Sequence, residues 1–201
     1  MTAAEVFDAY APDVRPPVLP ESDVSYAVED TPVGRLLLAV RADGRLVTSA
    51  YVRSADDEAA WLQRLSDVVS PRVLRHARPL DGVRRELDDY LAGRLTRFTV
   101  PTDLALASAF QREVLGELAA HVGYGSATTY GQLASTISRP KASRAVGTAL
   151  GANPVCVFVP CHRVLPAGGS VGGRVGVGGY AGGPAAKEYL LALEATHRPS
   201  A

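Results

Sequence analysis

Strand-forming residues are gathered near the start of the chain, which confines the expected β-sheet to one end of the molecule. Residues 24–52, VSYAVEDTPVGRLLLAVRADGRLVTSAYV, consist of β-branched and apolar runs separated by Ala-Asp-Gly, a turn typical of hairpins. Two helical patterns follow, at 54–70 and at 80–93. This order predicts an N-terminal α/β domain with a small antiparallel sheet and helices.

Single residues indicate where these elements begin and end. Ser54 or Asp56 would cap the first helix, and Gly93 would end the second. The sequence RFTVP at 97–101 could add a short strand. We place this domain at residues 23–103 and expect it to support the rest of the molecule, because catalytic residue types are not concentrated there.

The second half of the chain shows helical patterns separated by short turns. They occupy residues 108–122, 128–137 and 141–153, and Thr128 or Thr129 would cap the second of them. A short helix, a tight turn and a helix with basic residues at its start are typical of a helix-turn-helix. We predict a mostly helical C-terminal domain over 104–201 that contains a helix-turn-helix, an arrangement typical of DNA-binding units.

The last of these predicted helices has an unusual composition for a DNA-reading helix. Its candidate contact face carries Arg144 near the start and then only small residues, namely Ala142, Ala145, Gly147 and Ala149. Reading bases in the major groove requires long hydrogen-bonding side chains, whereas small residues let a helix backbone approach a narrow groove. Packing against another helix would explain the alanines equally well, but it would not explain Arg144.

Charge is unevenly distributed along a chain whose net charge is zero at pH 7. No Asp or Glu lies between Glu117 and Glu188. Six cations lie in that interval: Arg139, Lys141, Arg144, Arg163, Arg174 and Lys187. A surface that meets an anionic partner would account for this distribution. A segment that is simply rich in glycine and alanine would account for it too.

Several classes of protein are not indicated by this sequence. Residues 1–22 lack the basic and apolar regions of a secretory signal and are predicted to be a flexible extension. Apolar runs are too short for a membrane span, and the two cysteines match no disulfide framework or zinc spacing. The glycine-rich residues 168–183 lack the phosphate-binding P-loop pattern. We therefore expect a cytoplasmic protein without a metal or a nucleotide cofactor.

The two cysteines have different surroundings in the sequence. Cys156 alternates with valines at 155–159, a predicted buried strand, and is expected to be structural. Cys161 follows Pro160, which would end that strand and leave the cysteine exposed at a rim. A nucleophilic thiol requires a base or a lowered pKa. His162 is the candidate base, acting through a bend or a bridging water, and Glu194 could orient its imidazole.

These motifs resemble those of the O6-alkylguanine-DNA alkyltransferases, also called methylated-DNA–protein-cysteine methyltransferases. The segment NPVCVFVPCHRV at 153–164 contains the core PCHR followed by valine or isoleucine that is typical of this family. Further segments of the family are matched, in family order, by LDDYLAGRLTRFTVP, FQREVLGELAAHVGYGSATTYGQLA, RPKASRAVGTALGANP and GGYAGG with AKEYLLALE. The resemblance extends from about residue 24 to 194. It implies that the helix-turn-helix unit is winged-helix-like, binds DNA and carries the active site.

The resemblance implies roles for the catalytic residues. Cys161 would accept the alkyl group, His162 would act as a base through water, and Glu194 would complete the relay. Asn153 would brace the site, and Lys187 would lie near the pocket.

The resemblance also implies which residues bind the substrate and DNA. Tyr130 would rotate the target nucleotide outward, and Arg144 would fill the space that it leaves. Tyr180 would help to donate a hydrogen bond to the guanine oxygen. Further substrate-binding positions are Val164 and Ala181, and further DNA-binding positions are Thr129, Ala142, Ala145, Gly147 and Arg163.

The activity implied is direct-reversal DNA repair. The protein, expected to be a monomer, would flip O6-alkylguanine out of double-stranded DNA through the minor groove and transfer the alkyl group irreversibly to Cys161. About six extra residues near 173–178, with Arg174 as a candidate phosphate contact, leave the range of alkyl groups open. Two alternatives are a non-catalytic alkylguanine sensor and a Cys-His hydrolase.

Overall fold

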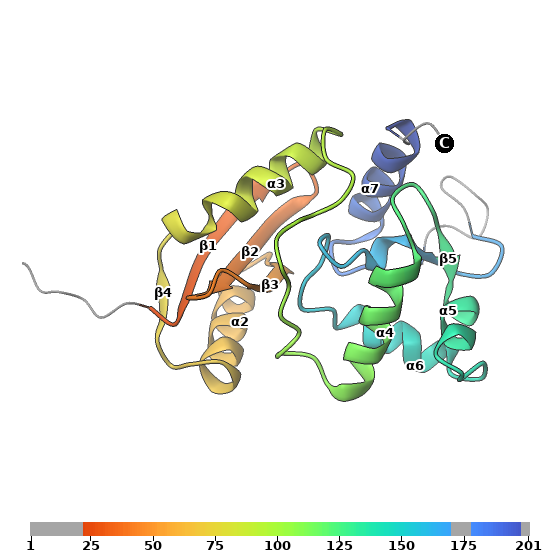
Figure 1. Cartoon of the computed structure of the whole chain (residues 1–201), viewed down its shortest axis with the longest axis horizontal. Helices are drawn as coiled ribbons and strands as arrows, with labels where there is room; N and C mark the ends of the chain where they lie inside the picture. Colours follow the sequence, from red (N-terminus) through yellow and green to blue (C-terminus); the bar gives the residue numbers. More distant parts are fainter. Residues whose placement is uncertain (1–21, 170–177, 198–201) are drawn as a thin grey trace, which may run out of the picture.

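The structure, a computed structural model, describes residues 22–169 and 178–197. Figure 1 shows a sheet-containing half formed by the first part of the chain beside a helical half formed by the second part. The predicted extension lies outside the described residues except for Ser22. The inserted residues 173–178 and Arg174 also lie outside them, apart from Gly178.

Four strands form the sheet, in the order β3-β2-β1-β4. They are β1 (Val24–Thr31), β2 (Gly34–Arg41), β3 (Leu46–Tyr51) and β4 (Val73–Arg75). The first three pair antiparallel as predicted, with β1 and β2 joined by a tight turn. The three-residue β4 pairs parallel to β1, so the sheet is mixed rather than purely antiparallel.

Helices cover both faces of this sheet, because β2 is apolar on both sides. Leu36, Leu38 and Val40 belong to the same core cluster as residues of α3 (Asp81–Leu91), which follows the short 3-10 helix η1 (Arg78–Leu80). Leu37 and Ala39 face the cluster that includes Leu65 of α2 (Ala55–Val68). Figure 1 shows α2 and α3 on opposite sides of the sheet.

The predicted ends of these helices are confirmed. The Ser54 hydroxyl accepts a hydrogen bond from the Asp57 backbone N–H and so caps α2. Gly93 has a φ of 73°, the left-handed conformation that ends a helix at low cost only for glycine. It lies immediately after Ala92, which caps α3.

The linker between α3 and α4 runs between the two halves (Figure 1). The predicted strand at 97–101 is wrong, because only Thr102 makes an isolated bridge, to Leu46 of β3. The linker is held instead by side chains: Glu86 of α3 accepts from the backbone N–H groups of Thr99 and Val100, at 2.8 and 3.2 Å. Arg41 also donates to Asp103 at 3.0 Å.

The helical half contains the predicted helix-turn-helix. α4 (Ala109–His121) packs against both α5 (Tyr130–Thr136) and α6 (Ser143–Gly151). Ser108 and Thr129 begin the first two helices through reciprocal hydrogen bonds with the glutamines three positions later. Val114, Leu115 and Leu118 of α4 are buried in the large core cluster, as their helical spacing predicts.

The C-terminal part of the chain returns to this core. Residues Cys161–Arg163 form a 3-10 helix, η2, followed by the two-residue strand β6 (Val164–Leu165), which pairs with β5 (Thr128–Thr129). The last helix, α7 (Pro184–Thr196), begins at a proline as predicted and contacts η2.

The predicted buried strand at 155–159 is wrong. Val157 has a φ of 72°, so the chain turns there, and Cys156 forms a bridge with Val159 within the same turn. The turn is attached to the edge of β3: the Ser49 N–H donates to the Pro154 carbonyl at 2.9 Å, and the Cys156 N–H donates to the Ser49 carbonyl at 2.7 Å. The segment before Cys161 is therefore bonded to the N-terminal sheet through its backbone.

None of the helices among residues 22–169 and 178–197 combines the length and the apolar character that crossing a membrane requires.

Candidate active site

Cys161 lies at the wall of a small cavity. It begins η2 and is 5% exposed, which corrects the prediction of an open rim. The cavity has a volume of about 270 Å³. Its lining combines the helix-turn-helix with the segments around Cys161 and Tyr180: Tyr130, Gly147, Leu150, Gly151, Cys161, Gly179, Tyr180 and Ala181. Access to the sulfur is therefore through this cavity.

Asn153 holds the acceptor cysteine in place. Its side-chain amide donates to the Cys161 Sγ atom at 3.1 Å and to the Val159 carbonyl at 3.0 Å. Its side-chain oxygen accepts from the Val155 N–H at 3.0 Å. One buried amide thus fixes both ends of the turn and places an N–H dipole on the sulfur, which stabilises a thiolate.

The two buried thiols affect each other's ionisation, while the Cys156 thiol itself donates to the Asn153 carbonyl at 3.4 Å. The pKa of the Cys161 thiol lies below its ordinary value, first because of the neighbouring Cys156 thiol and then because of Asn153 and the Lys187 charge; together these outweigh burial. The pKa of Cys156 is raised by the neighbouring Cys161 thiol and by burial. Cys156 is buried as predicted, but it also stabilises the neighbouring thiolate.

His162 and Glu194 form a fully buried pair behind the cysteine. The imidazole Nε2 atom lies 2.8 Å from Glu194 Oε1. Burial is the main cause that lowers the pKa of His162, so the neutral ring donates from Nε2 to the carboxylate. The Nδ1 atom is buried and has no hydrogen-bond partner among the described residues. Its lone pair is free to accept a proton.

Arg163 does not lie on the expected DNA-binding surface. Its side chain is buried, its Nε atom donates to both Glu194 oxygens at 3.0 and 3.1 Å, and Nη1 donates to the Val122 carbonyl at 2.7 Å. An arginine that recognises DNA must reach phosphate, whereas this one compensates a buried carboxylate. The position of Arg163 in the sequence, directly after His162, did not indicate that its side chain would be buried against Glu194.

Glu194 is the centre of this buried network. Besides Arg163 and His162, it accepts from the Tyr90 hydroxyl at 2.5 Å and from the Gly125 N–H at 3.0 Å. Burial alone would raise its pKa, but the hydrogen bonds and charges of His162 and Arg163 lower it to about 2. The carboxylate is therefore ionised at every pH at which the protein would work.

Lys187 is fully buried in α7 and contacts residues next to the cavity. Its ammonium donates to the Val164 carbonyl at 2.6 Å and to the Gly179 carbonyl at 3.4 Å, and it lies 5.9 Å from the centre of the Tyr130 ring. Burial lowers its pKa to about 8. Val164 thus contributes a backbone oxygen here rather than a side-chain contact.

Tyr180 and Ala181 border the cavity and are held by residues that sequence reasoning missed. Tyr51, at the end of β3, donates from its hydroxyl to that of Tyr180 at 3.3 Å. Arg53 donates to the Ala181 carbonyl at 2.5 Å. Nothing in the local sequence marks Tyr51 or Arg53 as part of a site, because both belong to the half expected only to give support.

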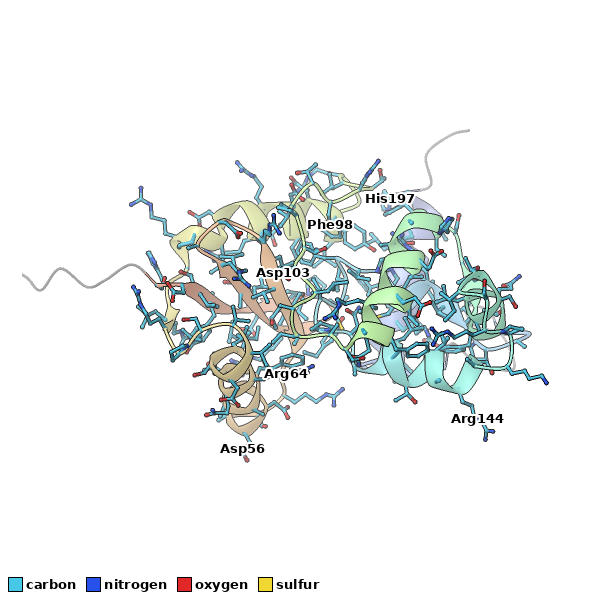
Figure 2. The ribbon with its side chains drawn as sticks, turned by 60° about the horizontal axis from the view of Figure 1, so that its bottom comes forward. Asp56, Arg64, Phe98, Asp103, Arg144 and His197 are labelled. Carbon is cyan, nitrogen blue, oxygen red and sulfur yellow. The ribbon has the colours of Figure 1, made fainter. Side chains whose placement is uncertain are left out.

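The helix-turn-helix presents Arg144 to solvent. Figure 2 shows its side chain projecting outward from α6. A second cavity of about 430 Å³ lies here, lined by Arg144, Tyr130, Gly131, Ser143, Gly147 and Ala167. Gly147 lies against the Tyr130 ring, and a Cβ atom there would be 3.7 Å from it. Tyr130 and Gly147 therefore border both cavities.

The other predicted DNA-contacting positions on this unit differ in exposure. Ala145 is exposed and Ala142 is partly exposed, whereas Ala149 is buried and its inclusion in the contact face was wrong. Thr129 caps α5 with its side chain and is partly buried.

The interval between Glu117 and Glu188, which contains no Asp or Glu, contributes less positive surface charge than its six cations suggest. Lys187 and Arg163 are buried, and Arg139 forms an ion pair with Glu113 at 3.0 Å. Arg144 in the first turn of α6 and Lys141, two residues before that helix, remain exposed. Within the described residues, the exposed unpaired charge that this interval contributes is thus small and local to the helix-turn-helix. No group of His, Cys, Asp and Glu that could hold a metal occurs among those residues.

Comparisons with known proteins agree with this geometry. The family described as "6-O-methylguanine DNA methyltransferase, DNA binding domain" matches residues 109–196. A methylated-DNA–protein-cysteine methyltransferase of Mycolicibacterium paratuberculosis is 37% identical over 88% of this chain and 96% of its own length. The protein of the same name from Methanosarcina acetivorans is also 37% identical, over 84% of this chain and 97% of its own.

Solved structures show the same likeness in three dimensions. A crystal structure of Mycobacterium tuberculosis O6-methylguanine methyltransferase has a TM-score of 0.70 and 33% identity, covering 89% of this chain and 96% of that one. The Mycobacterium tuberculosis protein in complex with DNA has a TM-score of 0.69 and 32% identity over 88% of this chain and 96% of that one.

Proposed function

This chain belongs to the methylated-DNA–protein-cysteine methyltransferase family, and on that premise we propose that it repairs DNA by moving an alkyl group from the O6 atom of guanine to Cys161. The observation that carries the proposal is a stabilised thiol on the wall of a cavity beside the helix-turn-helix. A DNA-binding role for that unit is supported by the family match to residues 109–196.

Reaching the sulfur requires the nucleotide to leave the helix. Cys161 is only 5% exposed, and the O6 atom of a paired guanine lies inside the duplex. Flipping costs a few kcal/mol, which contacts to the opened duplex must offset. The exposed side chain of Arg144 projects from α6 and would enter the space that the base leaves, and the small residues of α6 would let the helix approach the minor groove.

The reaction is a displacement at the alkyl carbon. The Cys161 thiolate attacks that carbon, a carbon–sulfur bond forms, and the carbon–oxygen bond breaks with its electron pair remaining on guanine. His162 would take the thiol proton through a water at Nδ1, the buried nitrogen that lacks a partner among the described residues. Guanine then takes up one proton. The thioether is stable, so each molecule reacts once.

The proposal is tested by mixing the protein with duplex DNA that contains O6-methylguanine. Mass spectrometry should show one methyl group per protein molecule, and peptide mapping should place it on Cys161. The DNA should contain unmodified guanine in the same amount. Tight binding with the methyl group still on the base would contradict transfer and would favour a damage sensor instead.

Replacing Arg144 with alanine should slow repair in duplex DNA by about 100-fold, the size expected if it compensates a few kcal/mol of unstacking. Reaction with free O6-benzylguanine should be unchanged, because no base has to be flipped. The matched control is Lys141→Ala, which removes an exposed cation from the start of the same unit. Equal losses for duplex and free base in Arg144→Ala would show that Arg144 does not act on flipping.

A further inference from the structure

We propose that Tyr51 of the N-terminal sheet is a positioning residue, which aims the Tyr180 hydroxyl into the alkyl-transfer cavity. This inference rests on the proposed function and extends it, because it makes the N-terminal half part of the active site. The chemistry that Tyr51 would serve is the departure of guanine, whose oxygen gains negative charge as the bond to the alkyl carbon breaks.

The two tyrosines meet across the molecule, although 129 positions separate them in the chain. The Tyr51 hydroxyl donates to the Tyr180 hydroxyl oxygen at 3.3 Å. Their rings meet edge to face, with centroids 5.5 Å apart and planes at 75°. Tyr180 is in turn edge-on to the His162 ring at 6.3 Å and lines the cavity of Cys161. Tyr51 therefore contacts the cavity wall from behind.

The backbone around Tyr180 is held by the same strand end. Arg53 donates to the Ala181 carbonyl at 2.5 Å, and its own N–H donates to Asp57 at 2.8 Å. A Cβ atom on Gly182 would lie 2.5 Å from the Tyr51 ring, so the ring rests directly on the Gly182 backbone. Three consecutive residues, 180–182, are thus fixed by two residues of the N-terminal half.

The hydrogen-bond direction gives this contact a chemical consequence. Because the Tyr180 oxygen accepts from Tyr51, its own O–H is left to donate to an acceptor in the cavity. A hydroxyl that accepts one hydrogen bond becomes a better donor in the next, since the two polarise each other. Burial is the main cause that raises the pKa of both phenols, so both keep their protons at neutral pH.

The donor would act where charge develops during the reaction. Preorganised donors aimed at a developing oxyanion lower the barrier, because they need no reorganisation when the bond breaks. Tyr180 would donate a hydrogen bond to the guanine oxygen, and Tyr51 would fix and strengthen that donor. No proton is transferred along the pair, so no further reactant is needed.

The decisive variant is Tyr51→Phe, which removes the hydroxyl and keeps the ring on Gly182. The rate of methyl transfer from O6-methylguanine DNA should fall about five-fold, the factor expected for one neutral hydrogen bond. Alkylation of Cys161 by iodoacetamide should keep the wild-type rate, because iodide leaves without a hydrogen-bond donor. Thermal unfolding of the variant confirms that it is folded.

The matched control is Tyr26→Phe. Tyr26 is a partly buried phenol of the N-terminal half, and it packs against the core cluster that contains Leu37 and Leu65. The variant should transfer methyl at the wild-type rate. The double variant Tyr51→Phe with Tyr180→Phe should be no slower than Tyr180→Phe alone, because Tyr51 acts only through Tyr180.

The outcomes separate this inference from the function on which it rests. A wild-type protein that takes no methyl group overturns the proposed function itself. Normal methyl transfer by Tyr51→Phe overturns only the positioning role, and so does an additional loss in the double variant. A slower iodoacetamide reaction in Tyr51→Phe also overturns it, because the effect would then be on the thiol.

Discussion

Replacing Cys161 with serine should abolish methyl transfer from O6-methylguanine DNA, with no adduct on any residue. The hydroxyl that replaces the thiol is a much weaker nucleophile, and the surrounding groups are arranged for a thiolate: the Asn153 amide at 3.1 Å, the Cys156 thiol and the Lys187 charge. Volume and burial hardly change, so the variant should fold and should still bind damaged DNA. Intact-protein mass spectrometry measures the result directly.

The second cysteine supplies the matched control. Cys156→Ala should still take up one methyl group, because the acceptor sulfur is present, but more slowly, because the neighbouring thiol that lowers the pKa of Cys161 is removed. Peptide mapping should find the adduct on Cys161. An adduct in Cys161→Ser at Cys156 would mean that the wrong sulfur has been assigned as the acceptor.

Replacing Glu194 with glutamine should destabilise the protein by about 3 to 5 kcal/mol, the cost of leaving a buried charge without its partner. Glutamine has nearly the same shape, but its neutral amide leaves the buried guanidinium of Arg163 uncompensated. It also places an NH2 group where His162 and Tyr90 donate. The free energy of unfolding in urea measures the loss, and methyl transfer should fall with it.

The acid dependence of stability provides a second readout for Glu194. Its pKa is about 2 in the folded protein and 4.5 ordinarily, so protonation favours the unfolded chain. The carboxylate contributes stability fully above about pH 4.5, and that contribution is lost as the pH falls towards 2. The amount is about 3 kcal/mol. Glu194→Gln should lack this component of the acid transition.

Glu188→Gln is the matched control, because it removes an exposed carboxylate from the same helix. Its stability in urea and its acid transition should match those of the wild type. If the two variants behave alike, the buried network of Glu194 contributes nothing beyond net charge.

Local patterns predicted the helices well, because their ends depend on neighbouring residues. Ser108 and Thr129 each lie three positions before a glutamine, and both form the reciprocal cap that this spacing favours. Gly93 ends α3 because its left-handed backbone conformation costs little only for glycine. The antiparallel strands of the sheet follow from their β-branched and apolar runs and from the turn residues between them.

Predictions failed where the deciding contact comes from a distant part of the chain. The run from Val155 to Val159 has the composition of a strand, but Asn153 and the edge of β3 bend it into a turn. Arg163 belongs to a basic stretch, but Glu194 on another helix holds it inside. Tyr51 has no local motif at all, and only the fold brings it to Tyr180.

Because backbone bonds join β3 to residues 154–156, we expect each half of this protein to lose part of its structure when it is separated from the other. A fragment that begins near residue 104 would lack the strand whose edge shapes the turn before the acceptor sulfur. The complementary fragment would expose an unpaired strand edge, a surface prone to aggregation. Engineered versions of this chain should therefore carry fusion partners at the termini and keep the junction intact.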